Sequence, residues 1–134
     1  MAVCHMCLGD GWATLQPSQL RPPSEIAKCI ETEGAAIASK IPQNAVIAAM
    51  CIEGEMLSSE SFSQKLENLM SDESASELCF IIGGSYGLSD EIKKRAKLKL
   101  SLSRMTFTHQ ISRVLILEQI YRAFQISTGG KYHK

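Results

Sequence analysis

Short apolar runs alternate with longer stretches of helical spacing along this 134-residue chain. Residues 45–52 and 78–82 are almost continuously apolar, which is typical of strands buried on both faces of a parallel sheet. Residues 98–103 alternate weakly between leucines and polar side chains. We therefore predict three strands at these positions.

The segments between the apolar runs have the spacing of helices. A helix is predicted to begin with Ser24 as its capping residue and to reach about residue 40. A second helix follows a cap at Ser58 or Ser59. A short third helix is predicted to start after Ser89, where two acidic residues suit a first turn.

The last predicted helix is the longest and covers residues 108–126, with Thr106 or Thr108 as its cap. Its apolar residues form one wide face, made of Ile111, Val114, Leu115, Leu117, Ile120, Tyr121 and Phe124. Strands that alternate with helices predict an α/β fold, with a parallel sheet and helices on both faces. Ligands of such folds bind at the carboxyl ends of the strands.

Length and composition fit one folded domain, since 45% of residues are hydrophobic and 21% are charged. Residues 1–24 contain three prolines and no sustained periodicity, so we predict an irregular amino terminus and a domain over residues 25–134. No apolar run reaches the ~20 residues of a membrane helix. No secretory signal is visible either, so we expect a cytosolic protein that does not contact the membrane.

Charge is distributed unevenly along a chain whose net charge is zero. Residues 25–78 contain ten acids and three bases, and residues 79–134 contain ten bases and three acids. A net charge of −7 in one half and +7 in the other indicates that the second half binds a polyanion. Attraction between the two halves, or between subunits, explains the asymmetry equally well.

Two connections have the composition of ligand-binding loops. Residues 83–87 (GGSYG) follow a predicted strand, and glycines there allow close approach of backbone to a ligand, although an ordinary tight turn is an equal alternative. Their spacing is neither the dinucleotide fingerprint nor a Walker loop. Residues 100–110 combine four hydroxyl side chains with large apolar ones, which suits a pocket for a base, or merely a capped helix start.

Few groups suit a metal or a hydrolytic reaction. Cys4 and Cys7 form a CxxC motif, but no second pair of ligands completes a zinc site, so we expect no metal. No Ser-His-Asp set or pair of catalytic carboxylates stands out.

The carboxyl-terminal tail has two possible roles. Residues 129–134 (GGKYHK) are either a frayed end or a tail that swings a titratable group into a site.

Several segments, in this order, resemble one family. They are residues 51–66 (CIEGEMLSSESFSQKL), 80–89 (FIIGGSYGLS), 100–124 (LSLSRMTFTHQISRVLILEQIYRAF) and 129–134. The chain is similar, from about residue 25 onward, to the RlmH family of bacterial 23S rRNA pseudouridine N3-methyltransferases, in the SPOUT superfamily. Residues 1–24 do not resemble the strands and helix with which members of that family begin.

The resemblance implies a SPOUT-type α/β fold with a carboxyl-terminal trefoil knot, here without the family's usual first strand region. It implies a homodimer that binds S-adenosylmethionine and methylates N3 of a pseudouridine in 23S rRNA on the assembled ribosome. Carried onto this sequence, the cofactor contacts are Met50, Gly83, Leu102, Ser103, Arg104, Met105, Thr106 and Phe107.

The family's tail is thought to complete the active site across the dimer. The resemblance therefore makes His133 the candidate that assists loss of the N3 proton, and Tyr132 the candidate that orients the reacting groups. Five basic residues are candidates for holding RNA phosphates: Lys93, Lys94, Arg95, Arg104 and Arg113.

Two other functions stay open at this point. The first alternative is a non-catalytic remnant that dimerises or binds ribosomes without turnover, and the missing front strand motivates it. The second is a nucleotide-binding module of flavodoxin type that uses the glycine turn. The absence of a phosphate-binding loop in the sequence disfavours this second alternative. Binding of S-adenosylmethionine separates the methyltransferase from the remnant. Competition by S-adenosylhomocysteine but not ATP separates it from the nucleotide-binding module.

Overall fold

A parallel sheet of four strands, in the order β1-β3-β2-β4, forms the centre of the structure. The structure is a computed structural model that describes residues 3–7, 22–71 and 77–132. Its elements are β1 (Val3–Cys7), α1 (Pro23–Ala38), β2 (Ala45–Glu55), α2 (Ser59–Met70), β3 (Glu77–Ile82), α3 (Asp90–Arg95), β4 (Leu98–Leu100) and α4 (His109–Ser127). The predicted α/β fold with a parallel sheet is confirmed.

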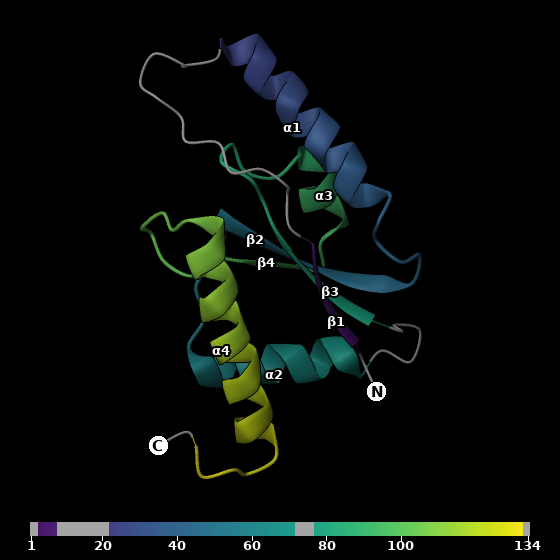
Figure 1. The fold of residues 1–134 in the computed structure, drawn as a ribbon. Coiled ribbons are helices and arrows are strands. Elements are labelled where there is room, and N and C mark those ends of the chain that lie inside the picture. Colours follow the sequence, from purple (N-terminus) through teal and green to yellow (C-terminus); the bar gives the residue numbers. More distant parts are fainter. Residues whose placement is uncertain (1–2, 8–21, 72–76, 133–134) are drawn as a thin grey trace.

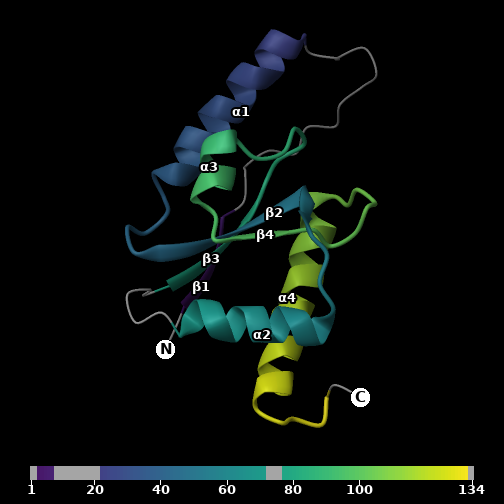
Figure 2. The same ribbon diagram turned by 180° about the vertical axis from the view of Figure 1, so that it is seen from behind.

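Helices cover both faces of the sheet, as predicted. α1 and α3 lie on one face, and α2 and α4 lie on the other, which two opposite views show (Figures 1 and 2). Within the part of the chain that the structure describes, no helix is both long and apolar enough to cross a lipid bilayer.

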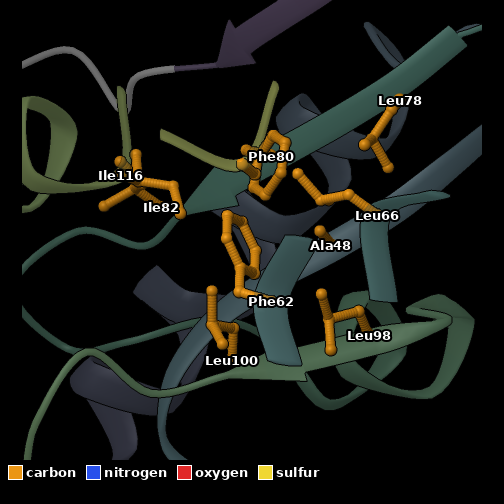
Figure 3. Packing of buried hydrophobic residues seen from close by; sticks show 10 residues of the cluster. Ala48, Phe62, Leu66, Leu78, Phe80, Ile82, Leu98, Leu100 and Ile116 are labelled. Carbon is orange, nitrogen blue, oxygen red and sulfur yellow. The ribbon is translucent and has the colours of Figure 1, made fainter. Parts of the chain in front are cut away.

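The larger hydrophobic cluster lies between the sheet and the α2–α4 pair. Phe80 of β3 is 1% exposed, and its ring packs edge-on against Phe62 of α2, with 6.3 Å between ring centroids (Figure 3). Ala48 of β2 and Ile116 of α4 belong to the same cluster. Alternate residues of the strands point to the opposite face, where Ile47 and its neighbours pack against α1 and α3.

Three of the predicted capping residues are at helix starts. The hydroxyls of Ser58, Ser89 and Thr108 each accept a hydrogen bond from the backbone N–H three residues further on. Ser24 does not cap α1, because this helix begins at Pro23, two residues before the start that a cap at Ser24 predicts, and Ser24 lies in its first turn. The fixed φ of proline favours that position, so the helix starts there without a side-chain cap.

The amino terminus differs from the expected irregular segment. Val3–Cys7 form β1, which pairs in parallel with β3 and covers what would otherwise be the edge of that strand. Five residues are too few to show a period, and their pairing depends on a strand seventy residues away, so local pattern does not predict it. Residues 8–21 of the expected segment lie outside the described part of the chain.

The apolar face predicted for the last helix is mostly not buried. Ile116 and Ala123 are the α4 residues that enter the core. The exposed large apolar residues of this helix, each 47–66% exposed, are Ile111, Val114, Leu117, Tyr121 and Phe124. The chain therefore presents an apolar stripe along α4, which we call the α4 stripe.

Truncation of Phe80 to alanine tests the packing of this core. Phe80→Ala is expected to lower the free energy of unfolding by about 3–5 kcal/mol, because a fully buried aromatic ring leaves a cavity. Met56→Ala, at a side chain that is 54% exposed, is the control and is expected to change it by less than about 0.5 kcal/mol. Urea denaturation measures both; equal effects would contradict the packing described here.

Candidate functional site

β2 leaves the regular ladder just where it passes β4. Met50 and Glu55 both pair with Leu100 of β4, so the four residues between them have no partners in the ladder. The backbone N–H of Ser101 donates to the carbonyl of Glu55 over 2.9 Å and closes this irregularity. Bulges of this kind turn side chains away from a sheet and are frequent beside functional sites.

The glycine turn follows the neighbouring strand. Met50 of β2 lies opposite Ile82 of β3 in the parallel register, so the bulge and the turn are at the same end of the sheet. The N–H of Gly87 donates to the carbonyl of Gly84 over 3.0 Å. Gly87 has a φ of +87°, a conformation that side chains with a Cβ rarely adopt, so the tight turn requires glycine there.

The third segment is the connection from β4 to α4. The Ser101 hydroxyl donates to the carbonyl of Ser103 over 2.9 Å, and the Ser103 hydroxyl accepts from the N–H of Met105 over 3.1 Å. These local bonds replace ladder bonds, which explains why β4 ends at Leu100 and not at residue 103 as predicted.

The bulge, the glycine turn and this connection together enclose a cavity of about 750 Å³. Residues 101–103 and 105–107 form one wall, and α3 and the start of α4 contribute Lys93, His109 and Ser112. Its volume falls within the ~300–1,000 Å³ of typical small-molecule sites. Apolar side chains, hydroxyls and a charged pair line it, a combination that accommodates a ligand with a flat apolar part and a charged part.

The structure brings most of the predicted cofactor residues to this cavity. Those that line it are Met50, Gly83, Leu102, Ser103, Met105, Thr106 and Phe107. Arg104 is exposed and is not among the lining residues. A second cavity, of about 460 Å³, lies beside the same connection, between α2 and α4. It shares Leu100, Ser101, Leu102 and Phe107 with the first.

An ion pair at the cavity was not predicted. Glu53 in the bulge and Lys93 of α3 approach to 2.5 Å between Oε1 and Nζ, and both line the cavity. The hydrogen bond from Lys93 lowers the pKa of Glu53, and the same bond raises the pKa of Lys93. An acid directly after a buried strand is a signal that sequence reasoning had available, but the bulge that aims it at α3 has no local pattern.

The bulge also holds Cys51, which is half-buried. Burial raises the pKa of its thiol, and the nearby Glu53 carboxylate raises it further. The thiol form therefore predominates at neutral pH, which is the less nucleophilic form.

The predicted RNA-binding cations lie in two different situations. Lys94, Arg95, Arg104 and Arg113 are exposed on the surface. Lys93 is only partly exposed and is paired with Glu53, so it faces the cavity and not a phosphate in bulk solvent.

Tyr132, the described member of the predicted catalytic pair, lies away from the cavity. The Tyr132 hydroxyl is 3.2 Å from Oε1 of Glu118, whereas α4 reaches the cavity near its first residues, His109 and Ser112. Along a helix these positions are separated by roughly 10 Å. His133 lies outside the described residues.

Removal of Lys93 tests the ion pair between Lys93 and Glu53. In Lys93→Met, the pKa of Glu53 is expected to rise toward its usual 4.5, because the group that stabilises the carboxylate is gone. In the unchanged protein the pair contributes to stability at neutral pH. The contribution is lost as pH falls through the lowered pKa of Glu53, or rises through the raised pKa of Lys93. Carboxyl NMR titration measures the first effect.

Lys94→Met is the matched control, since its side chain is exposed and the neighbouring lysine keeps the pair. The Glu53 midpoint is expected to stay in place in this variant. An identical midpoint in the Lys93→Met and Lys94→Met proteins would contradict the pairing.

Comparison with known proteins shows to which family the chain belongs. A family model described as "Predicted SPOUT methyltransferase" matches residues 10–133. The chain is 50% identical over 104 residues to "Ribosomal RNA large subunit methyltransferase H" of Clostridioides difficile (strain 630), covering 78% of this chain and 65% of the relative. It is 46% identical over 114 residues to the protein of that name from Carboxydothermus hydrogenoformans, and the match covers 84% of this chain and 70% of that relative.

A third relative with the same name, from Streptococcus pneumoniae (strain CGSP14), is 48% identical over 111 residues, with 83% of this chain and 69% of the relative covered. The chain thus spans about two thirds of the length of the curated relatives that it matches. The family match extends over most of the chain and includes all three segments that enclose the cavity. The chain belongs to the SPOUT methyltransferase family.

Proposed function

We propose that this chain is a methyltransferase that uses S-adenosylmethionine and methylates N3 of a pseudouridine in 23S rRNA on the assembled ribosome, in the cytoplasm. One observation carries the proposal: Met50, the glycine turn and residues 101–107, distant in sequence, enclose a single cavity at the carboxyl ends of the strands. The names of the relatives, large-subunit rRNA methyltransferases, support the substrate class.

The residues present fit this cofactor. Leu102, Met105 and Phe107 offer apolar walls for a flat purine ring, and the hydroxyls of Ser103 and Thr106 can bond its polar edge. The charged amino-acid end of the cofactor suits the Glu53–Lys93 pair. When bound, the cofactor supplies an activated methyl group, so the protein mainly aligns donor and acceptor.

Transfer to N3 of pseudouridine requires the N3 proton to leave. In the proposal, His133 assists this loss and Tyr132 orients the reacting groups. As the family resemblance implies, the tail of one protomer serves the cavity of its partner. The contact of Tyr132 with Glu118, away from the cavity of its own chain, supports this. The α4 stripe supports the homodimer that this requires, since exposed apolar stripes mark association surfaces.

The exposed cations Lys94, Arg95, Arg104 and Arg113 hold RNA phosphates. A net charge of zero favours recognition of a composite ribosomal surface over nonspecific binding to free RNA. We also propose that the carboxyl-terminal part of the chain forms a trefoil knot. The path of the chain supports this: after β4, at the edge of the sheet, it passes β2 and packs α4 against α2 and β3.

Methyl transfer to ribosomes tests the function and the role of His133 together. The chain is incubated with labelled S-adenosylmethionine and with ribosomes that lack the modification, and labelled nucleosides are identified by mass spectrometry. Label is expected at N3 of one pseudouridine. His133→Ala is expected to lower kcat by about 100-fold or more, the usual contribution of a positioned acid or base.

Lys131→Ala is the control, because this exposed tail residue has no part in the proposed chemistry. Transfer at the original rate by His133→Ala would remove His133 from the mechanism. Binding of S-adenosylmethionine without any transfer by the unchanged chain would favour the non-catalytic remnant.

A further inference from the structure

The end of α4 turns the chain back toward its own helix. The N–H of Gly130 donates to the carbonyl of Gln125 over 2.7 Å, and the N–H of Gly129 donates to the carbonyl of Ile126 over 3.1 Å. These two bonds form a Schellman motif, which requires a left-handed residue, and Gly129 has a φ of +69°. The double glycine is therefore a defined turn.

Beyond this turn, Tyr132 contacts three side chains of α4. Its hydroxyl lies 3.2 and 3.3 Å from the two carboxylate oxygens of Glu118. Its ring packs edge-on against Tyr121, with 5.0 Å between centroids, and the Arg122 guanidinium lies 4.8 Å from its ring centroid. Polar, aromatic and cation–π contacts thus converge on one tail residue.

The α4 side of this contact is organised within the helix itself. Glu118, Tyr121 and Arg122 are spaced i, i+3 and i+4, so they share one face. Nη2 of Arg122 lies 2.6 Å from Oε1 of Glu118, which orients both charged groups. This set, which we call the tail anchor, presents a carboxylate, a ring and a cation to Tyr132 at once.

The chemistry of the contact argues against Tyr132 as an acid or base. The hydrogen bond to Glu118 and the charge of that carboxylate raise the pKa of the Tyr132 phenol. The phenol therefore stays protonated at neutral pH and donates to Glu118, which leaves it a poor proton acceptor for the reaction.

We propose that Glu118, Tyr121 and Arg122 are positioning residues that hold Tyr132, and that Tyr132 acts through this anchor to fix the point from which residues 133 and 134 continue. The inference rests on the proposed function, in which His133 assists proton loss. Because successive Cα atoms are ~3.8 Å apart, holding Tyr132 limits how far from the anchor the next residue can lie. The hydroxyl of Tyr132 contacts Glu118 and takes no part in proton transfer.

Two substitutions of Tyr132 separate positioning from chemistry. Tyr132→Phe keeps the ring contacts with Tyr121 and Arg122, and is expected to lower kcat for ribosome methylation by no more than about fivefold, the scale of one exposed polar interaction. Tyr132→Ala removes every contact and is expected to lower kcat by more than about tenfold, with the KM for S-adenosylmethionine unchanged.

A loss of about 100-fold in Tyr132→Phe, equal to that in Tyr132→Ala, would identify a catalytic hydroxyl and overturn the proposal. Unchanged kcat in Tyr132→Ala would also overturn it. Binding of S-adenosylhomocysteine by each variant is the control for an intact fold and cofactor site.

A second measurement needs no activity and so separates this proposal from the proposed function. NMR titration of ring-labelled tyrosine is expected to give Tyr132 a pKa above its usual 10.0, which falls back toward that value in Glu118→Gln. The Tyr132→Phe spectrum assigns the signal among the three tyrosines. If the pKa of Tyr132 is ordinary and Glu118→Gln does not change it, the anchor is overturned, even if the chain methylates ribosomes. A shifted pKa in a chain without methyl transfer would refute the function and keep the anchor.

Discussion

The parallel pairing of β2 with β3 is the constraint on which the site depends. Because Met50 lies opposite Ile82 in this register, whatever follows each strand emerges at the same end of the sheet. β2 bulges just beyond Met50, and the glycine turn follows β3. β4, paired on the other side of β2, brings residues 101–107 to the same end. Three short segments far apart in sequence thus enclose one cavity.

This register is maintained by burial on both faces. Ala48 and Phe80 point toward α2 and α4, and Ile47 and Ile81 point toward α1 and α3. A shift of one residue would exchange the two sets and place the bulky Phe80 side chain on the wrong face. The core therefore determines the geometry of the cavity as well as the stability of the fold.

Local pattern was sufficient for the elements that carry their own signals. The apolar runs at 45–52 and 78–82, and the caps at Ser58, Ser89 and Thr108, depend on side chains within a few residues, and the structure has them where they were predicted. Most of the cavity residues named from the family resemblance also lie together. Local pattern did not predict the features that depend on distant partners. β1 forms by pairing with β3, and the Glu53–Lys93 pair depends on a bulge in β2 that arises in its pairing with β4.

Placement of the ligand is tested most directly by backbone NMR during titration with S-adenosylhomocysteine. Saturable shifts are expected at the amides of residues 51–53, 83–87, 101–103 and 105–107, which line the larger cavity. The α1 amides are expected to stay in place, since no residue of this helix is among the described residues that line the cavity. Shifts confined to the smaller cavity between α2 and α4, or no saturable shifts in a folded chain, would contradict the assignment of this end of the sheet as the cofactor site.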